Sequence, residues 1–214
     1  MLYQDIVIGI ATDRGINNGQ PSLHARCLAA CAPRPGETVI HVGAGTGYYT
    51  AVLARLIDNN GRILAFEIEP DLAARARENL AHLSNVAVSA ASGTEGSLPS
   101  SDLIHVNAGA TYPIPSWLDA LNIGGRLIFP LTPNEGFGCM LLVRVKAKAR
   151  TLRARWLGQR SYRVSEHGTK RHPSPLRQRL SGNRCNPFAL CGEMTRRIEQ
   201  LGALRSASRR DTLS

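Results

Sequence analysis

The fold is decided by the stretch Val39-Ile40-His41-Val42-Gly43-Ala44-Gly45-Thr46-Gly47, in which a β-rich run ends in glycines. Helical spacing follows from Tyr49 to Ile57, so the pattern predicts a strand, a glycine loop and a helix that begins at the loop. Glycine at such positions lets the backbone approach a ligand without a Cβ in the way. The amino end of the helix adds N–H donors and the positive end of the helix dipole. The stretch therefore predicts a ligand-binding turn.

A carboxylate stands at the matching place on the next predicted strand. Glu67 ends the run Arg62 to Glu67 and follows Gly47 by 20 residues. A carboxylate at that strand end can accept hydrogen bonds from both hydroxyls of an adenosine ribose. The alternative is a purely structural turn with Glu67 as a solvated strand end. The matched strand ends favour the binding site.

The spacing of the glycines indicates which ligand this turn takes. Here it is Gly-x-Gly-x-Gly, and the bulky Tyr48 follows Gly47. The dinucleotide fingerprint is Gly-x-Gly-x-x-Gly, whose third glycine allows close helix packing. A phosphate loop of the Walker type is excluded, because no Gly-Lys-Ser/Thr follows. The turn therefore favours an adenosyl ligand without phosphates.

Apolar runs and helical patterns alternate through the first two thirds of the chain. The patterns predict helices at 21–32, 49–57, 71–83 and 117–121, and strands at 38–42, 62–67, 85–88, 102–107, 124–130 and 139–145. Successive βα units give a Rossmann-like, doubly wound α/β fold with a mostly parallel sheet. Only about seven residues, 132–138, precede the last strand, so we expect it to be an antiparallel edge strand. Residues 1–20 are short on periodic structure, and 15–19 reads as a turn or loop.

Charge divides the chain near Arg144. Residues 1–143 hold 8 basic and 12 acidic residues, whereas residues 144–214 hold 18 basic and 4 acidic ones. We therefore expect a single domain over 1–145 and a basic, poorly patterned, largely disordered segment over 146–214. Three interpretations of this segment are open: a tail that binds nucleic-acid phosphates, a solvated segment without a partner, or a shifted reading frame after about residue 150.

Several classes of protein are disfavoured by composition. No apolar run approaches the ~18 residues of a membrane span, and the amino end has no basic signal region, so no membrane partner is expected. The five cysteines show no Cys-x-x-Cys spacing, which favours reduced thiols and a cytoplasmic location. No metal site is predicted.

The ordered motifs resemble the protein-L-isoaspartate O-methyltransferase family of class I methyltransferases. The similar pieces are Gly19–Ala25, the loop at 39–47, Ala65–Leu72, Asp102–Ala110 and Leu121–Leu131. The resemblance covers about three-fifths of the chain. It implies a Rossmann-like sheet with one antiparallel strand, S-adenosyl-L-methionine as methyl donor, transfer to a carboxylate oxygen, and a protein or peptide substrate with a damaged aspartyl residue.

The expected cofactor site combines the strand ends with this resemblance. Ser92 falls at the family's position near the adenine amine. Asn107 ends the fourth strand, at the edge where open α/β sheets bind ligands, and should contact the methionine end or the substrate. The candidate cofactor-binding residues are Gly43, Ala44, Gly45, Gly47, Glu67, Ser92 and Asn107.

Three positions depart from the family pattern. Ser92 stands where the family has the Asp of an Asp-Gly pair, and its hydroxyl can still accept a hydrogen bond, though a neutral one. The family usually has an acidic residue where His41 stands, which helps hold the methionine end of the cofactor; we interpret His41 as a strand residue packed under the loop. The family's Ser-x-Pro loop, whose serine lies by the reacting carboxylate, aligns with Gly19-Gln20-Pro21, so the serine position is Gly19. This change puts isoaspartate repair in doubt but not cofactor binding.

No catalytic residue is assigned. A carboxylate acceptor is already ionised at neutral pH and needs no general base, so alignment can supply most of the rate. His24 and His105 are candidates for polar contacts near the site. We favour the alternative that they are a helix residue and a strand residue whose rings have their hydrogen-bond partners. Tyr48, Tyr49 and Tyr112 would either line the ligand pocket or serve only in amphipathic packing. The alternative functions are a nucleic-acid (rRNA) methyltransferase and a non-catalytic cofactor-binding relative.

Overall fold

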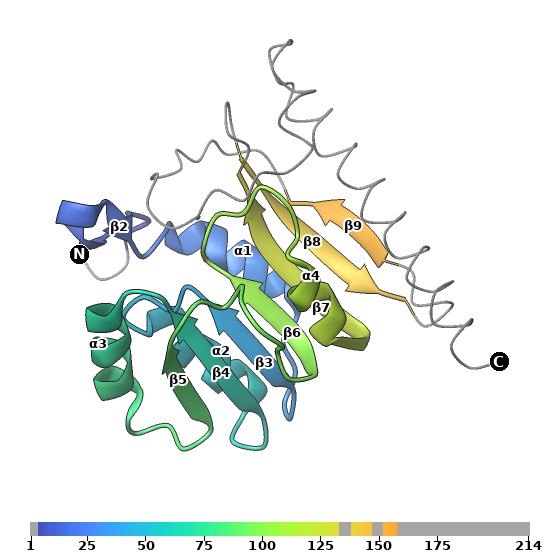
Figure 1. Cartoon of the computed structure of the whole chain (residues 1–214), viewed down its shortest axis with the longest axis horizontal. Helices are drawn as coiled ribbons and strands as arrows, with labels where there is room; N and C mark the ends of the chain where they lie inside the picture. The colour runs from blue at the N-terminus through green and yellow to red at the C-terminus, as the bar shows by residue number, and fades with distance from the viewer. Residues whose placement is uncertain (1–3, 133–137, 147–151, 158–214) are drawn as a thin grey trace, which may run out of the picture.

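The computed structural model describes residues 4–132, 138–146 and 152–157 (Figure 1). Within these ranges the helices are η1 (Thr12–Arg14, a 3-10 turn), α1 (Pro21–Cys31), α2 (Tyr48–Ile57), α3 (Pro70–Leu80) and α4 (Pro115–Ala120). The strands are β1 (Gly9–Ala11), β2 (Ile16–Asn17), β3 (Thr38–Val42), β4 (Arg62–Glu67), β5 (Val86–Ala90), β6 (Ser101–Val106), β7 (Leu121–Leu131), β8 (Cys139–Val145) and β9 (Leu152–Trp156).

One seven-stranded sheet carries the fold, in the order β5-β4-β3-β6-β7-β8-β9. The strands from β5 to β7 are parallel, and β8 runs antiparallel to β7. The predicted doubly wound sheet with an antiparallel strand is confirmed. β8 is not the edge, however, because β9 pairs with it in antiparallel register. β9 therefore carries the sheet past the domain boundary expected at residue 145, and the basic stretch from 158 to 214 lies outside the described residues.

The direction of winding reverses between β3 and β6. From β3 the chain proceeds through β4 to β5 on one side, and then returns to place β6 and β7 on the other. Ligands of open α/β sheets bind outside the carboxyl ends of the strands at such a switch point. Val42 and Val106 are opposed at this edge. The glycine loop after β3 and Asn107 after β6 therefore lie at the expected place.

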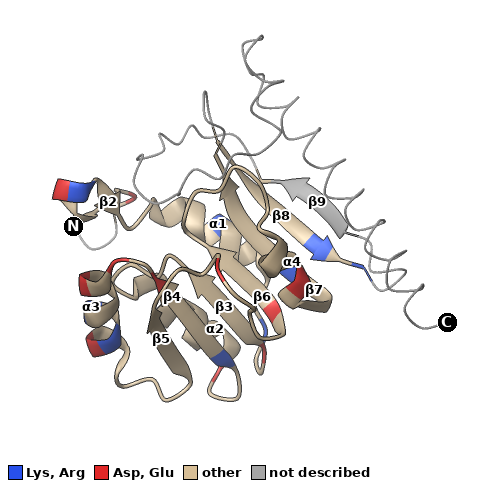
Figure 2. Cartoon of the chain, in the orientation of Figure 1, with Lys and Arg blue, Asp and Glu red and all other residues tan. Residues whose placement is uncertain are grey.

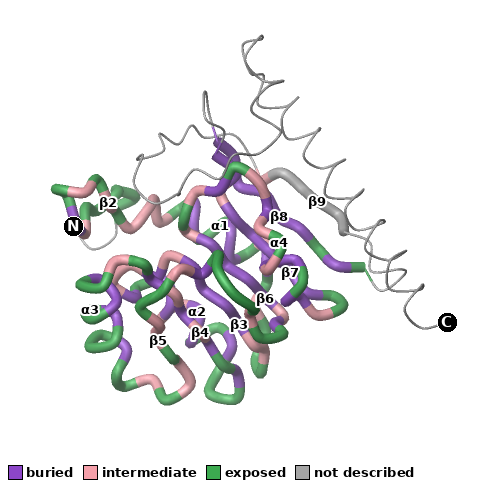
Figure 3. The backbone as a smooth tube through the Cα atoms, viewed as in Figure 1, coloured by how far each residue is buried: buried purple, intermediate pink, exposed green. Residues whose placement is uncertain are grey.

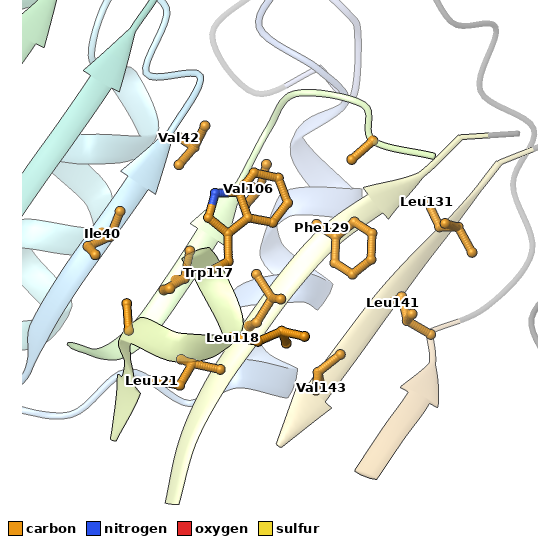
Figure 4. Packing of buried hydrophobic residues seen from close by; sticks show 14 of the residues in the cluster. Ile40, Val42, Val106, Trp117, Leu118, Leu121, Phe129, Leu131, Leu141 and Val143 are labelled. Atoms are coloured by element: carbon orange, nitrogen blue, oxygen red, sulfur yellow. The ribbon is translucent and has the colours of Figure 1, made fainter. Parts of the chain in front are cut away.

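The two faces of the sheet carry different layers, because alternate side chains of a strand point to opposite faces. Ile40, Val106 and Phe129 belong to the cluster that packs with Trp117 of α4 (Figure 4). Val39, Leu103 and Ile128 belong to the cluster that packs with α1 and α2, which lie behind the sheet in Figure 1. α3 packs along β4 and β5. The central strands are buried on both faces (Figure 3).

The amino-terminal segment is more ordered than its sequence indicates. β1 and β2 form a small antiparallel ladder around the η1 turn, within the stretch predicted to lack periodic structure. Asp5 then accepts hydrogen bonds from the Ser22 backbone N–H (2.8 Å), the Ser22 hydroxyl (2.8 Å) and the Gln20 amide (2.7 Å). A distant carboxylate thus supplies the cap that the first turn of α1 lacks locally.

The predicted element boundaries shift by a few residues, most at β7. This strand begins at Leu121 rather than at residue 124, since Gly124 (φ +82°) and its neighbours form an irregularity in the ladder with β6. Proline in the first turn of α1, α3 and α4 marks each start. α3 ends at Leu80, so its predicted end at residue 83 was too late.

A buried arginine joins the elements that meet where the parallel strands of the sheet begin. Arg126 pairs with both oxygens of Glu37 (2.6 and 2.8 Å). Its remaining donors reach the backbone carbonyls of Cys31 (3.0 Å), Ala32 (3.1 Å) and Asp102 (3.2 Å). The end of α1 and the starts of β3 and β6 are therefore held by one guanidinium, which is 5 % exposed.

We expect Arg126→Met to destabilise the fold by ~3–5 kcal/mol, because Glu37 Oε1 and the three backbone carbonyls would lose their charged donor. The exposed Arg55→Met should stay within ~0.5 kcal/mol of wild type. Urea unfolding monitored by circular dichroism measures both. A loss below ~1 kcal/mol for Arg126→Met would contradict this role.

Candidate functional site

The loop after β3 is built from backbone hydrogen bonds. The N–H groups of Gly43 and Ala44 both donate to the Phe66 carbonyl (2.9 and 3.0 Å), and Gly47 N–H donates to the Ala44 carbonyl (2.9 Å). Gly43 and Gly47 have positive φ values of +76° and +93°. A Cβ on Gly43 would lie 3.2 Å from the Ala108 nitrogen. The fold itself therefore requires glycine at these positions, in addition to any need of a ligand.

Glu67 joins this loop to the end of β4. Its Oε2 accepts from Gly45 N–H (2.7 Å) and its Oε1 from Glu69 N–H (3.0 Å). Burial raises the pKa of the Glu67 carboxyl, and the backbone N–H donors oppose that rise by stabilising the anion. Each carboxylate oxygen can accept a second hydrogen bond, so two acceptor positions remain for a diol.

The same bonds argue against a phosphate at this loop. Four of its N–H groups, on Gly43, Ala44, Gly45 and Gly47, already donate within the protein. The carboxylate of Glu67 would also repel an anion. Phosphate-binding loops need free N–H donors at this place. The geometry supports the interpretation of the glycine spacing as a site for a ligand without phosphates.

The loop after β5 approaches the same edge through Gly93. Trp117 Nε1 donates to the Gly93 carbonyl (2.7 Å), and a Cβ on Gly93 would lie 2.7 Å from Val42. Ser92 therefore lies near the end of β3. Its hydroxyl exchanges a hydrogen bond with the Thr94 hydroxyl (2.8 Å), and the residue is half-buried.

A polar layer lies under the loop, on the face covered by α1 and α2. We call His24, His41, His105 and Tyr49 the histidine layer. His24 stacks on Tyr49 with 3.8 Å between ring centroids, and His41 meets His105 edge-on at 5.5 Å. All four side chains are buried. His41 bonds through Nδ1 to Thr50 Oγ1 (2.8 Å) and through Nε2 to Asn107 Nδ2 (2.9 Å).

Most of the layer's remaining polar atoms are unpartnered in the part of the chain that the structure describes. The buried atoms without a hydrogen bond there are His24 Nδ1, Tyr49 Oη, both nitrogens of His105, and the neighbouring Asn107 Oδ1. His24 and His105 lie on a helix and a strand as expected, but the prediction that their rings are satisfied is wrong. Buried polar groups normally find partners, so such a concentration marks a functional site.

The layer is not a metal centre. Within residues 4–132, 138–146 and 152–157, no group of three or more His, Cys, Asp or Glu side chains could hold a metal ion. Burial lowers the pKa of His41 to about 3 and that of His24 to about 4, and it lowers the pKa of His105 as well. The three rings are therefore neutral near pH 7.

Tyr48 and Tyr112 differ in their relation to this layer, because the Tyr48 ring meets that of Tyr49 edge-on with 5.0 Å between ring centroids. Tyr48 is 61 % exposed at the start of α2, and Tyr112 packs against the core cluster on the α4 face. Cys27, Cys31 and Cys139 are buried, while Cys185 and Cys191 lie outside the described residues.

The imidazole of His24 lies where a side chain at position 19 would be. A Cβ on Gly19 would lie 2.3 Å from His24 Nε2, and the φ of Gly19 is +73°. A serine here would adopt a left-handed backbone and displace the imidazole from Tyr49. The absence of the family's serine is thus accommodated by the position of His24.

The amino-terminal segment lies over the loop. Ile10 is the neighbour of Gly45, at 2.9 Å from an added Cβ. Arg14 pairs with Glu69 and makes two hydrogen bonds to Asp71 (2.9 and 2.6 Å), close to Glu67. We call residues 8–18 the strap.

Sequence reasoning missed two of these contacts. No motif marks the bond between His41 and Asn107, which are 66 residues apart, although both stand near the carboxyl ends of adjacent parallel strands. Arg14 gave no sequence signal either, because its partners lie 55 and 57 residues away.

The strand order, with an antiparallel β8 beyond the parallel strands, is the Rossmann-like fold of class I methyltransferases. A family model described as Protein-L-isoaspartate(D-aspartate) O-methyltransferase (PCMT) matches residues 1–156, and the chain belongs to this family. A protein-L-isoaspartate O-methyltransferase from Ignicoccus hospitalis is 34% identical over 141 residues, which cover 64% of this chain and 66% of that protein.

Solved structures agree with this assignment. A protein-L-isoaspartate O-methyltransferase has a TM-score of 0.66 at 26% identity, covering 76% of this chain and 52% of that one. A Plasmodium falciparum structure described as a β-aspartate methyltransferase, in complex with S-adenosyl-L-homocysteine, has the same TM-score at 22% identity and covers 78% and 82%. That likeness supports the fold alone. The chain spans 53% to 66% of the length of three curated relatives.

The neutral histidines predict a pH dependence of stability. Below about pH 6.5 the unfolded chain binds protons that the folded layer does not, so stability should fall as pH decreases toward 4. His24→Phe, which keeps a ring against Tyr49, should reduce the slope between pH 6 and pH 4.5 by ~1.4 kcal/mol per pH unit. Comparison with wild type cancels the opposite contribution of Glu67.

Urea unfolding at several pH values measures this slope. The exposed Asn60→Ala, which removes no titratable group, provides the control, and its slope should equal that of wild type. An unchanged slope in His24→Phe would show that His24 is protonated in the folded state.

Proposed function

We propose that this chain transfers a methyl group from S-adenosyl-L-methionine to a carboxylate oxygen of an isoaspartyl residue in a protein or peptide. The observation that carries the proposal is the carboxylate of Glu67, bonded to the glycine loop at the switch point of the sheet. Relatives over the matched residues bear the name of that activity.

The residues present fit the adenosyl part of the cofactor. Glu67 would accept both ribose hydroxyls on the acceptor positions left free by its backbone donors. Ile68, 53 % exposed beside it, offers an apolar surface to adenine, and Ser92 a hydroxyl. The backbone of Gly43, Ala44, Gly45 and Gly47 would form the wall against which the cofactor rests, with Asn107 toward its methionine end.

The chemistry asks little of the protein beyond alignment. The cofactor's sulfonium supplies both the methyl group and a good leaving group. A carboxylate acceptor is ionised at neutral pH, so this chain needs no general base. Its residues would hold the acceptor in line with the methyl group and exclude water. We therefore assign no catalytic side chain.

The acceptor is the less constrained part of the proposal. Gly19 replaces the family's serine, and His24 lies in that space. Base methylation commonly uses an Asn/Asp-Pro-Pro-aromatic loop after the fourth strand of the domain. This chain has Asn107-Ala108-Gly109-Ala110 there, which disfavours a nucleic-acid acceptor.

Within the described residues every helix is too short or too polar to traverse a bilayer. Basic and acidic residues are interspersed along the described elements (Figure 2).

Cofactor binding tests the first half of the proposal. Titration calorimetry should show binding of S-adenosyl-L-methionine, and Glu67→Gln should weaken it by at least ~10-fold, because the amide donates where the carboxylate accepted. Glu78→Gln, an exposed change on α3, should leave it unaltered. Undetectable binding to wild type, or equal affinity in Glu67→Gln, would refute this site.

A labelled-methyl assay tests the acceptor. We expect transfer to an isoaspartyl peptide and not to RNA. Gly19→Ser should lower both the rate and the melting temperature, because of the left-handed φ and the contact with His24. Adding His24→Ala to Gly19→Ser should recover part of the loss. Preferential labelling of RNA would overturn the carboxylate acceptor, and no labelling with intact cofactor binding would indicate a non-catalytic relative.

A further inference from the structure

Asn107 occupies a defined place at the crevice between β3 and β6. Its backbone N–H donates to the Val42 carbonyl (2.8 Å), which ties the ends of the two strands together. The next residue, Ala108, abuts Gly43 of the glycine loop. Since Glu67 lies beyond β3 on the opposite side, a ligand whose ribose binds Glu67 extends toward Asn107 with its other end.

A chain of hydrogen bonds fixes the amide of Asn107. Its Nδ2 carries only donor hydrogens, so His41 Nε2 must accept (2.9 Å). A neutral imidazole that accepts at Nε2 carries its proton on Nδ1, which therefore donates to Thr50 Oγ1 (2.8 Å). His41 is fully buried, and burial holds it in this neutral form.

This arrangement leaves one strong acceptor without a partner. Asn107 Oδ1 is buried and receives no hydrogen bond from any described residue. With Nδ2 held by His41, Oδ1 is the amide atom that points away from the imidazole; the reversed amide would require the other His41 tautomer, with Thr50 Oγ1 donating to Nδ1. A fixed carbonyl oxygen at this place recognises a hydrogen-bond donor, and a cationic donor binds it most strongly.

We infer that Asn107 Oδ1, oriented by His41, receives the α-ammonium group of the cofactor's methionine. The inference rests on the proposed function, since it assumes that the adenosyl part binds at Glu67. His41 is then a positioning residue, which acts through Asn107.

Three ligands separate the groups of the cofactor. S-adenosyl-L-methionine has both the ammonium and the carboxylate, decarboxylated S-adenosylmethionine keeps only the ammonium, and 5′-methylthioadenosine has neither. Titration calorimetry of Asn107→Ala should show ~10-fold or greater loss of affinity for the first two ligands and none for the third. Unchanged binding of 5′-methylthioadenosine also shows that the variant is folded.

His41 is tested by two substitutions. His41→Leu removes the acceptor for Asn107 Nδ2 and should weaken decarboxylated S-adenosylmethionine but not 5′-methylthioadenosine. His41→Gln can still accept from the amide through Oε1 and should recover part of that loss. Asn60→Ala, an exposed change in the turn before β4, is the matched control and should alter none of the three affinities.

The outcomes distinguish this inference from the proposed function. Wild-type protein that binds none of the three ligands would refute the function itself. If all three bind, and Asn107→Ala changes none or weakens all alike, the function stands and the ammonium contact is wrong. Loss confined to S-adenosyl-L-methionine, with decarboxylated ligand unaffected, would also overturn it, because Asn107 would then face the carboxylate.

Discussion

A single buried carboxylate organises the ligand edge of this sheet. Glu67 ends β4, yet its oxygens hold the N–H of Gly45 in the loop after β3 and the N–H of Glu69 before α3. Two strand ends and two helix starts therefore depend on one side chain. The loop needs no phosphate to neutralise its donors, because the protein supplies the acceptors itself. The same geometry leaves the outer lone pairs of the carboxylate for a sugar.

Strand alternation explains why the polar layer lies beside that carboxylate. Going along one face of the sheet, β3 presents Val39 and then His41, while β6 presents Leu103 and His105 and is followed by Asn107. The face is apolar at the amino edge and polar at the carboxyl edge. α1 and α2 cover both parts, so the polar groups are desolvated without being fully satisfied. Stability alone would favour apolar side chains there, and groups retained against that preference are typical of binding sites.

The sequence was sufficient for elements with strong local signals. The bounds of β3, β4 and β8 match their apolar runs, and the short connection to β8 correctly implied an antiparallel strand. β9 was not predicted, because its Leu-Arg-Ala-Arg-Trp pattern stands where arginine suggests a solvated segment. The strap and the bond between His41 and Asn107 were missed for a different reason: they join residues distant in sequence, and no local pattern encodes them. The candidate cofactor residues follow from strand ends, whereas their partners require the fold.

The position of the strap has a kinetic consequence. Arg14 is held by Glu69 and Asp71, which lie within four positions of Glu67, so one short segment anchors both the strap and the expected sugar contact. A ligand resting against Gly45 would lie beside Ile10, so movement of the strap away from it would break those partly exposed ion pairs. Added salt weakens such partly exposed pairs, because it shortens the screening length from its value of about 10 Å at 0.1 M. Higher ionic strength would therefore shorten the residence time of electrically neutral adenosine as much as that of the charged cofactor, because the ion pairs that open belong to the strap and not to the ligand.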